Sequence, residues 1–153
     1  MIYVGDISVA DDNNEIDLAS GMAAFEEKNF SKAKQMLSPL AEAGNPEAQH
    51  RMAIMFQNGL GLVKSDELAF KWMQASAGLN YPLALHGLGF MYLHGECVDK
   101  DEAKAAEYFQ KAAEQGLAGS AMTLGLMYEQ GQGVKQDPDE AQKWYKKSEE
   151  LQE

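Results

Sequence analysis

Apolar and polar positions follow one another along this chain with the period of an amphipathic helix, and the whole pattern repeats. From residue 48 onward, apolar side chains fall three or four positions apart, as they do on one face of a helix. Closely spaced glycines follow, then a residue type that caps helix N-termini, and then a second apolar stripe. The step from Met52 to Leu88 to Leu124 is 36 residues each time, so the chain repeats one unit three times.

Equivalent positions in the three periods hold similar residues. They are Phe56, Tyr92 and Tyr128; Gly59, Gly95 and Gly131; Ala69, Ala105 and Ala141; and Trp72, Tyr108 and Trp144. The second helix of each period is predicted to begin at an N-cap, at Ser65, Asp101 or Asp137. Helices of about 11–15 residues are marginal alone in water, so they must bury their stripes against each other.

A fourth unit precedes these three, with a shorter turn between its helices. Ala33 lies 36 residues before Ala69, but Gly21 precedes Ala33 by 12 residues, whereas Ala53 precedes Ala69 by 16. The turn is therefore four residues shorter, which is the spacing of a tetratricopeptide repeat. We expect its second helix to begin at Ser31.

The three full periods resemble Sel1-like repeats, the long-turn relatives of tetratricopeptide repeats. The family pattern is A-x-x-x-L-G-x-x-Y-x-x-G-x-G-V-x-x-D followed by A-x-x-W-x-x-x-A-A-x-x-G. The second period matches it at Ala84, Leu88, Gly89, Tyr92, Gly95, Val98, Asp101, Ala105, Ala112, Ala113 and Gly116. The third period matches it at Leu124, Gly125, Tyr128, Gly131, Gly133, Val134, Asp137, Ala141 and Trp144. The first period departs with Met52 and Ala53 in place of Leu-Gly, and the second departs with Cys97 in place of glycine.

The repeat and the resemblance together predict an all-α fold, a right-handed α-solenoid of about four helix-turn-helix units and eight helices. The predicted organisation is a flexible acidic arm over 1–13 and one repeat domain over 14–150, with units at about 14–45, 46–81, 82–117 and 118–150. The arm is assigned because the first dozen residues lack helical periodicity and are rich in acids. In the units, the Trp72, Tyr108 and Trp144 series is expected to be core.

Composition narrows the classes of partner and compartment. The net charge of −11 argues against nucleic acid and anionic membranes, which need basic patches. The longest apolar stretch is interrupted by a histidine and by glycines and is too short to span a bilayer, so no membrane insertion is expected. No signal peptide is apparent, which favours the cytoplasm; a periplasmic or secreted protein whose signal has been removed is the alternative.

Two local motifs suggest chemistry, and both are better explained as structure. "YLHGECV" brings His94, Glu96 and the single cysteine Cys97 together, but zinc needs at least three protein ligands and no other cysteine exists. Ser31 to Lys34 matches S-x-x-K of penicillin-recognising enzymes, without the S-D-N or K-T-G motifs. We therefore predict no catalytic residue, no metal, no cofactor and no enzymatic activity.

The resemblance to tetratricopeptide-type solenoids implies that the first helices line a concave groove that holds a protein segment. The predicted groove residues are Met22, Phe25, His50, Ile54, Gln57, His86, Phe90, Leu93, His94, Met122, Leu126 and Glu129. Apolar and methionine-rich positions suit a bound peptide or helix. The open alternative is that these side chains pack between neighbouring repeats. The function expected is a protein–protein interaction module. The alternative is a binder of small molecules or cell-wall fragments, or a protein resembling β-lactam hydrolases. Weak self-association through the ends of the array is a further expectation.

Overall fold

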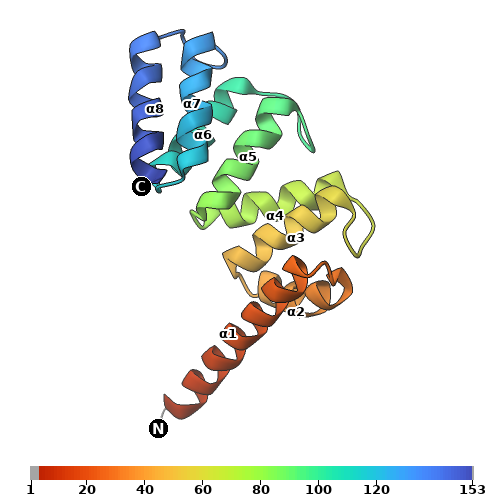
Figure 1. Ribbon diagram of the computed structural model, residues 1–153. Coiled ribbons are helices and arrows are strands. Elements are labelled where there is room, and N and C mark those ends of the chain that lie inside the picture. The colour runs from red at the N-terminus through yellow and green to blue at the C-terminus, as the bar shows by residue number, and fades with distance from the viewer. Residues whose placement is uncertain (1–3, 153) are drawn as a thin grey trace. The chain divides into compact units, whose positions relative to one another are not determined.

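The computed structural model describes the backbone of residues 4–152 and the side chains of residues 13–152. Within that range the chain forms eight helices and no strand (Figure 1). They are α1 (Val4–Glu26), α2 (Phe30–Glu42), α3 (Pro46–Asn58), α4 (Asp66–Gly78), α5 (Pro82–His94), α6 (Glu102–Glu114), α7 (Ala118–Gln130) and α8 (Pro138–Gln152). Two compact units divide the chain, unit 1 up to Trp72 and unit 2 from Met73. The all-α repeat fold with eight helices is confirmed; the right-handed superhelix stays a prediction.

The beginning of α1 differs from the expectation for the acidic arm. Residues 1–3 of the expected arm lie outside the described residues, but the backbone is helical from Val4 onward, ten residues before the expected first helix. An existing helix extends without the cost of a new nucleus, so a packed stretch can carry on into a sequence with little periodicity of its own. The first dozen residues lack helical periodicity in the sequence but include helical backbone from Val4, and the flexible acidic arm over 1–13 stays a prediction.

The N-caps of the second helices are side-chain oxygens at the predicted positions. Ser65 Oγ accepts from Leu68 N at 3.1 Å, Asp101 Oδ1 from Lys104 N at 3.1 Å, and Asp137 Oδ1 from Glu140 N at 3.1 Å. The first, shorter repeat is different. Its second helix, α2, begins at Phe30 with Asn29 as the N-cap, so the expected start at Ser31 is wrong by one residue. Each cap satisfies an N–H group that the first turn of a helix leaves unpaired.

The long turn between the two helices of a full-length repeat is held by the same backbone hydrogen bond in all three such repeats. The backbone N–H of the N-cap residue donates to the carbonyl of the aromatic position in the preceding helix: Ser65 to Phe56 at 3.0 Å, Asp101 to Tyr92 at 2.9 Å and Asp137 to Tyr128 at 2.9 Å. Gly133 has φ 71°, and a Cβ there would lie 2.2 Å from the carbonyl oxygen of Glu102. Cys97 adopts the same left-handed conformation with φ 64°, although it is not glycine.

The cores of the two units are built on the same contact between a small residue and a large one. A Cβ added to Gly21 would lie 2.6 Å from Leu37 Cδ2, and one on Gly89 would lie 2.8 Å from Phe109 Cε1. Leu37 and Phe109 are fully buried. The paired helices therefore approach each other closely at these two glycines.

The aromatic series Trp72, Tyr108 and Trp144 is not part of the fully buried core, contrary to the expectation. Trp72, Tyr108 and Trp144 are half-buried. A lysine ammonium lies over each ring: Lys71 at 5.1 Å from the ring centroid of Trp72, Lys111 at 5.4 Å from that of Tyr108 and Lys147 at 5.6 Å from that of Trp144. These rings therefore mark the edge of the core, where one face stays within reach of a solvated cation.

Candidate functional site

In unit 1, the side chain of Arg51 occupies the predicted groove face. Arg51 Nε donates to Met22 Sδ at 3.4 Å, and the guanidinium lies 5.0 Å from the centroid of the Phe25 ring. Its Nη2 is 3.5 Å from Glu26 Oε1. Met22 and Phe25 are half-buried, and the Phe25 ring also contacts the Phe30 ring, with centroids 5.6 Å apart. A positive charge is thus placed over the apolar positions that the sequence assigned to a partner.

The remaining predicted positions of unit 1 are also partly or fully covered. His50 is buried, with 7% of its surface exposed, while Ile54 and Gln57 are half-buried. Burial, followed by the positive charge of Arg51, lowers the pKa of His50 to about 4. His50 is therefore neutral near pH 7 and belongs to the interior rather than to an open surface.

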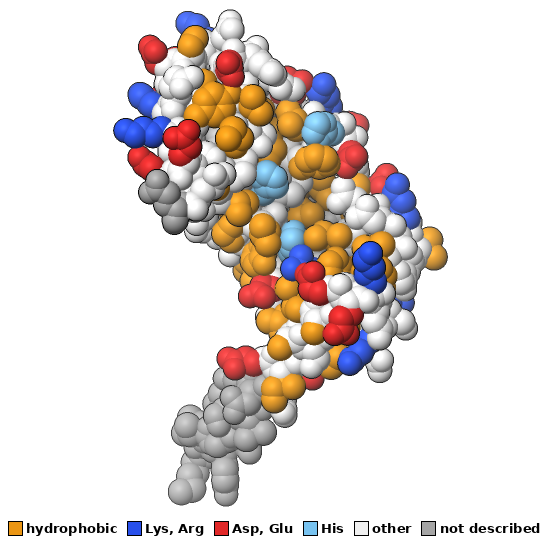
Figure 2. All heavy atoms as spheres, viewed as in Figure 1, with side chains coloured by type: hydrophobic (Ala, Val, Ile, Leu, Met, Phe, Trp, Pro, Cys, Tyr) orange, Lys and Arg blue, Asp and Glu red, His pale blue; other side chains and the backbone are white. Residues whose placement is uncertain are grey.

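Unit 2 presents an apolar surface on its first helices, α5 and α7. Its large exposed hydrophobic side chains there are Leu83 (38%), Phe90 (42%), Met122 (41%) and Leu126 (44%). Leu93, which also lies on α5, is half-buried. His94 and Glu129 are exposed. Figure 2 shows hydrophobic side chains gathered over this part of the molecule. We call the side chains of Leu83, Phe90, Leu93, Met122 and Leu126 the α5–α7 face.

A hydrogen bond between neighbouring repeats holds the two helices of this face together. His86 Nδ1 of α5 lies 2.7 Å from Ser120 Oγ of α7, and Ser120 is fully buried. The His86 ring also contacts Phe109 edge-on, with centroids 5.1 Å apart. Burial lowers the pKa of His86. Sequence reasoning missed Ser120. The available signal was a serine at a repeat position where the other two full-length repeats have alanine, Ala48 and Ala84.

Two further contacts fix the polar residues at the end of the face. The rings of Phe90 and His94 are tilted against each other with centroids 4.4 Å apart. The hydroxyl of Tyr145 donates a hydrogen bond to Glu129 Oε2. That bond is the first cause that raises the pKa of Tyr145 to about 12. Glu129, predicted to meet a partner, thus already has a partner within unit 2.

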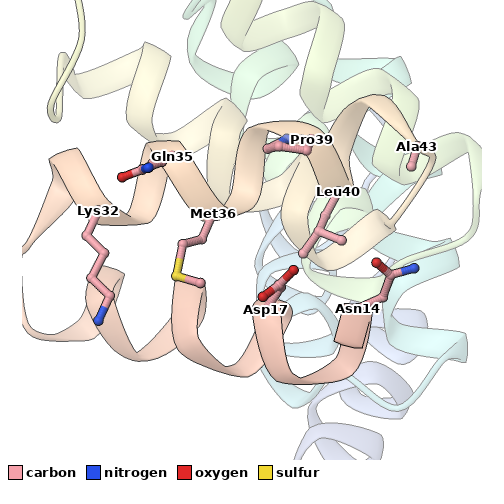
Figure 3. A pocket seen from close by; sticks show the side chains of 8 residues that line it. All are labelled: Asn14, Asp17, Lys32, Gln35, Met36, Pro39, Leu40 and Ala43. Atoms are coloured by element: carbon pink, nitrogen blue, oxygen red, sulfur yellow. The ribbon is translucent and has the colours of Figure 1, made fainter. Parts of the chain in front are cut away.

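The cavities lie away from the predicted groove residues. One of about 460 Å³ lies between α1 and α2, and Figure 3 shows its lining. The lining residues are Asn14, Asp17, Lys32, Gln35, Met36, Pro39, Leu40 and Ala43. Another, of about 350 Å³, is lined in unit 2 by residues that include Tyr108 and Lys111. None of the twelve predicted residues lines either of these two cavities.

The described side chains offer little for metal or covalent chemistry. Among residues 13–152, no group of three or more His, Cys, Asp or Glu side chains is placed to hold a metal ion. Cys97, the single cysteine of the sequence, is half-buried in the turn after α5. Ser31 and Lys34 are exposed in the first turns of α2, where the sequence favours a helix start over a reactive centre. The β-lactam-related alternative stays a prediction.

No helix in the described part of the chain combines the length and hydrophobicity that crossing a bilayer requires.

Comparison with known families and structures extends the repeat over most of the chain. The model of the Sel1 repeat family matches residues 21–45, 46–81, 82–117 and 120–152. A Sel1 repeat protein from Oxalobacter formigenes has a similar crystal structure, with a TM-score of 0.82 and 28% identity over 87% of this chain and 55% of that one. The protective antigen c5321 of uropathogenic Escherichia coli, which displays an SLR fold, gives a TM-score of 0.74 and 34% identity over 76% of this chain and 25% of the antigen.

A more distant likeness shows the fold alone. Helicobacter pylori cysteine rich protein B is 23% identical with a TM-score of 0.64, and the match covers 82% of this chain and 90% of that protein. The chain spans about half the length of the Oxalobacter protein and a quarter of that of the E. coli antigen. A comparison with curated proteins finds no significant match.

Proposed function

Because the chain belongs to the Sel1 repeat family, whose members generally mediate protein–protein interaction, we propose that it is an interaction module that binds a protein segment on the α5–α7 face. The observation that supports this choice of surface is the cluster of four large hydrophobic side chains, each about two-fifths exposed, on two helices held together by the His86–Ser120 bond. Exposed apolar clusters on folded proteins commonly mark contact sites.

The charge distribution supports the same surface. The helix α5 contains no Asp, Glu, Lys or Arg, and α7 contains only Glu129. The charged residues of unit 2 lie instead on α6, α8 and the turns. Since interface cores are depleted of charge and enriched in aromatic residues and methionine, α5 and α7 have the composition of an interface.

Burying this apolar surface contributes favourable free energy to the binding of a partner. Completing the burial of a side chain such as Phe90 or Leu126, already more than half-buried, is worth about 1 kcal/mol. The five side chains of the face together contribute about 5 kcal/mol towards the cost of association. The partner we propose is therefore an apolar or amphipathic segment, matched to the face by shape and hydrophobicity rather than by charge.

The test uses a peptide selected from a random phage-displayed library against the full chain. Phe90→Ala and Leu126→Glu should each weaken binding by about tenfold or more, as expected for anchors near the centre of an interface. Fluorescence anisotropy measures the binding, and a thermal melt checks that each variant keeps its fold.

The matched control is Leu79→Ala, which removes an exposed leucine of unit 2 outside α5 and α7. This variant should bind the peptide like the wild type. Equal binding by all four proteins would overturn the proposal. A fall in the melting temperature of Phe90→Ala that accounts for its loss of binding would assign Phe90 to the packing between repeats instead.

A further inference from the structure

One stripe of α5 carries an aromatic ring between two histidines, and it runs along the α5–α7 face. His86, Phe90 and His94 are four residues apart, so they point to the same side of the helix. The ring of His94 lies against Phe90, and that of His86 lies against Phe109 and Ser120. Any partner that covers Phe90 therefore lies beside both imidazoles.

We propose that binding at the α5–α7 face is coupled to proton release from His86, so that acid weakens the binding of the partner. The inference rests on the proposed function of this face. Its physical basis is that an apolar partner removes the remaining water from the His86 ring, and desolvation disfavours the charged form of histidine. The partner consequently binds the neutral form of the protein more tightly than the protonated form.

The surroundings of His86 provide no negative charge that would offset this penalty. Burial is the cause of the lowered pKa of His86, and its neighbours across the helix pairs are the uncharged Phe109 and Ser120. Of the charged groups on the elements packed against it, Glu107 of α6 is exposed, and the others have contacts elsewhere. In α6, Lys104 lies over Tyr92, Lys111 over Tyr108, Glu102 beside Lys100 and Glu114 beside Gln110, while in α7 Glu129 accepts from Tyr145.

The His86–Ser120 bond survives protonation, so the coupling does not depend on breaking it. A hydroxyl both donates and accepts, and Ser120 Oγ can therefore partner Nδ1 whether or not that nitrogen carries a proton. The fold of unit 2 should thus stay intact in mild acid while the affinity of the face falls.

The direction follows from linkage. If the partner lowers the pKa of a histidine, affinity is constant above the pKa of the free protein and falls as the pH drops through it. For His86 this onset lies below 6.5, because burial already lowers its pKa from that value. Each further unit of lowering by the partner permits about a tenfold loss of affinity.

The probe for the test is Nile red, an uncharged dye of apolar surfaces, titrated into the full chain by fluorescence. The dissociation constant should rise severalfold, but by less than about tenfold, between about pH 7.5 and about pH 5.5, because the onset lies below 6.5. In the double variant His86→Gln, His94→Gln it should change less than about twofold. Circular dichroism over the same range checks that the fold is kept.

A second readout is the NMR titration of the imidazole protons. Saturating Nile red should lower the pKa of His86, whereas the resonance of His50 should stay unchanged, because its pKa of about 4 lies outside this range. His50 is the repeat equivalent of His86 in unit 1 and so serves as the internal control.

The outcomes separate the inference from the function on which it rests. Dye binding that is lost in Phe90→Ala but independent of pH in the wild type overturns the inference and leaves the docking face standing. The same is true if the double variant keeps the full pH dependence. Dye binding that ignores both Phe90→Ala and Leu126→Glu overturns the docking face and the inference together.

Discussion

The first helices of the two units follow the same repeat pattern but expose different chemistry. In unit 1, Arg51 lies over Phe25 and bonds to Met22, so the predicted groove positions are covered from within the chain. In unit 2, about two-fifths of the surface of Phe90 and of Leu126 is exposed. The repeat equivalents of Arg51 are Gly87 and Thr123, whose side chains are absent or too short to cover a ring. This position in the repeat therefore differs between the two faces, and the variants below test whether it decides which face is covered.

The comparison also shows what the repeat keeps constant. Gly21 against Leu37 in unit 1 and Gly89 against Phe109 in unit 2 are the same contact between paired helices. The core is therefore conserved in geometry while the surface above it varies. The predictions below ask first whether the cores are equivalent and then whether the faces can be exchanged.

The largest effect is expected in the cores. Phe109→Ala should lower the free energy of unfolding by about 3–5 kcal/mol and Leu37→Ala by about 2–5 kcal/mol, because each removes a fully buried side chain and leaves a cavity. Urea denaturation followed by circular dichroism measures both. Trp144→Ala should do less damage, since its ring is half-buried. A loss below about 1 kcal/mol for either core variant would show that the two contacts are not equivalent.

The second effect distinguishes the histidines of the two units. His50 has a folded-state pKa of about 4, below the value of about 6.5 expected for an unfolded chain. Its contribution to stability is complete above 6.5 and is lost as the pH falls toward 4, amounting to about 3 kcal/mol. Urea denaturation at a series of pH values should show this loss in the wild type and not in His50→Gln. Identical pH profiles for the two proteins would refute the buried, neutral state of His50.

Much of the fold follows from the sequence because the repeat averages over local exceptions. Ser65, Asp101 and Asp137 were each predicted as N-caps, and each accepts the expected backbone hydrogen bond. Two features did not follow. The helix from Val4 extends a packed helix into a segment without periodicity of its own, and the Trp144 ring is kept half-exposed beside Lys147, which an apolar stripe cannot reveal.

The candidate face followed from the sequence only in part. Alignment of the repeats named Phe90, Leu126 and Met122, which are exposed in unit 2, and these remain predictions as partner contacts. The same alignment could not distinguish unit 1, because the covering residue, Arg51, is not itself a groove position. The His86–Ser120 bond joins residues 34 apart, and only the packing of α5 beside α7 brings them together.

Replacing a glycine of the long turn should destabilise the protein by a similar, intermediate amount in unit 1 and in unit 2. Gly61→Ala and Gly133→Ala should each destabilise the protein by about 1–3 kcal/mol, because both glycines have positive φ and pack against the backbone or Cβ of the preceding second helix. Thermal melts measure the effect. Gly119→Ala, in open space within α7, should be neutral or stabilising. A tolerated Gly133→Ala would contradict the close approach to Glu102.

Opening the closed face is expected to have a smaller effect on stability. Arg51→Thr gives unit 1 the residue found at position 123, and it removes the ring contact with Phe25 and the ion pair with the largely exposed Glu26, at a cost of about 1 kcal/mol. The variant should gain a second Nile red site. NMR should show a rise in the pKa of His50 that leaves it below 6.5, because burial is the larger cause and persists. No gain in dye binding would mean that Met22 and Phe25 are covered by more than Arg51.

Covering the α5–α7 face with an arginine should have the smallest effect on the free energy of unfolding and the largest effect on binding. By the repeat offset that relates Gly21 to Gly89, the residues over which Arg51 lies, Met22 and Phe25, correspond to Phe90 and Leu93. Thr123→Arg therefore places a guanidinium over the α5–α7 face, and His94 stands where unit 1 has Glu26, so no ion pair adds to stability. We expect a change in unfolding free energy within about 0.5 kcal/mol and loss of both peptide and Nile red binding. If Thr123→Arg binds as tightly as the wild type, the covering arginine does not explain why the two faces differ, and the comparison between the units has to be rebuilt on another residue.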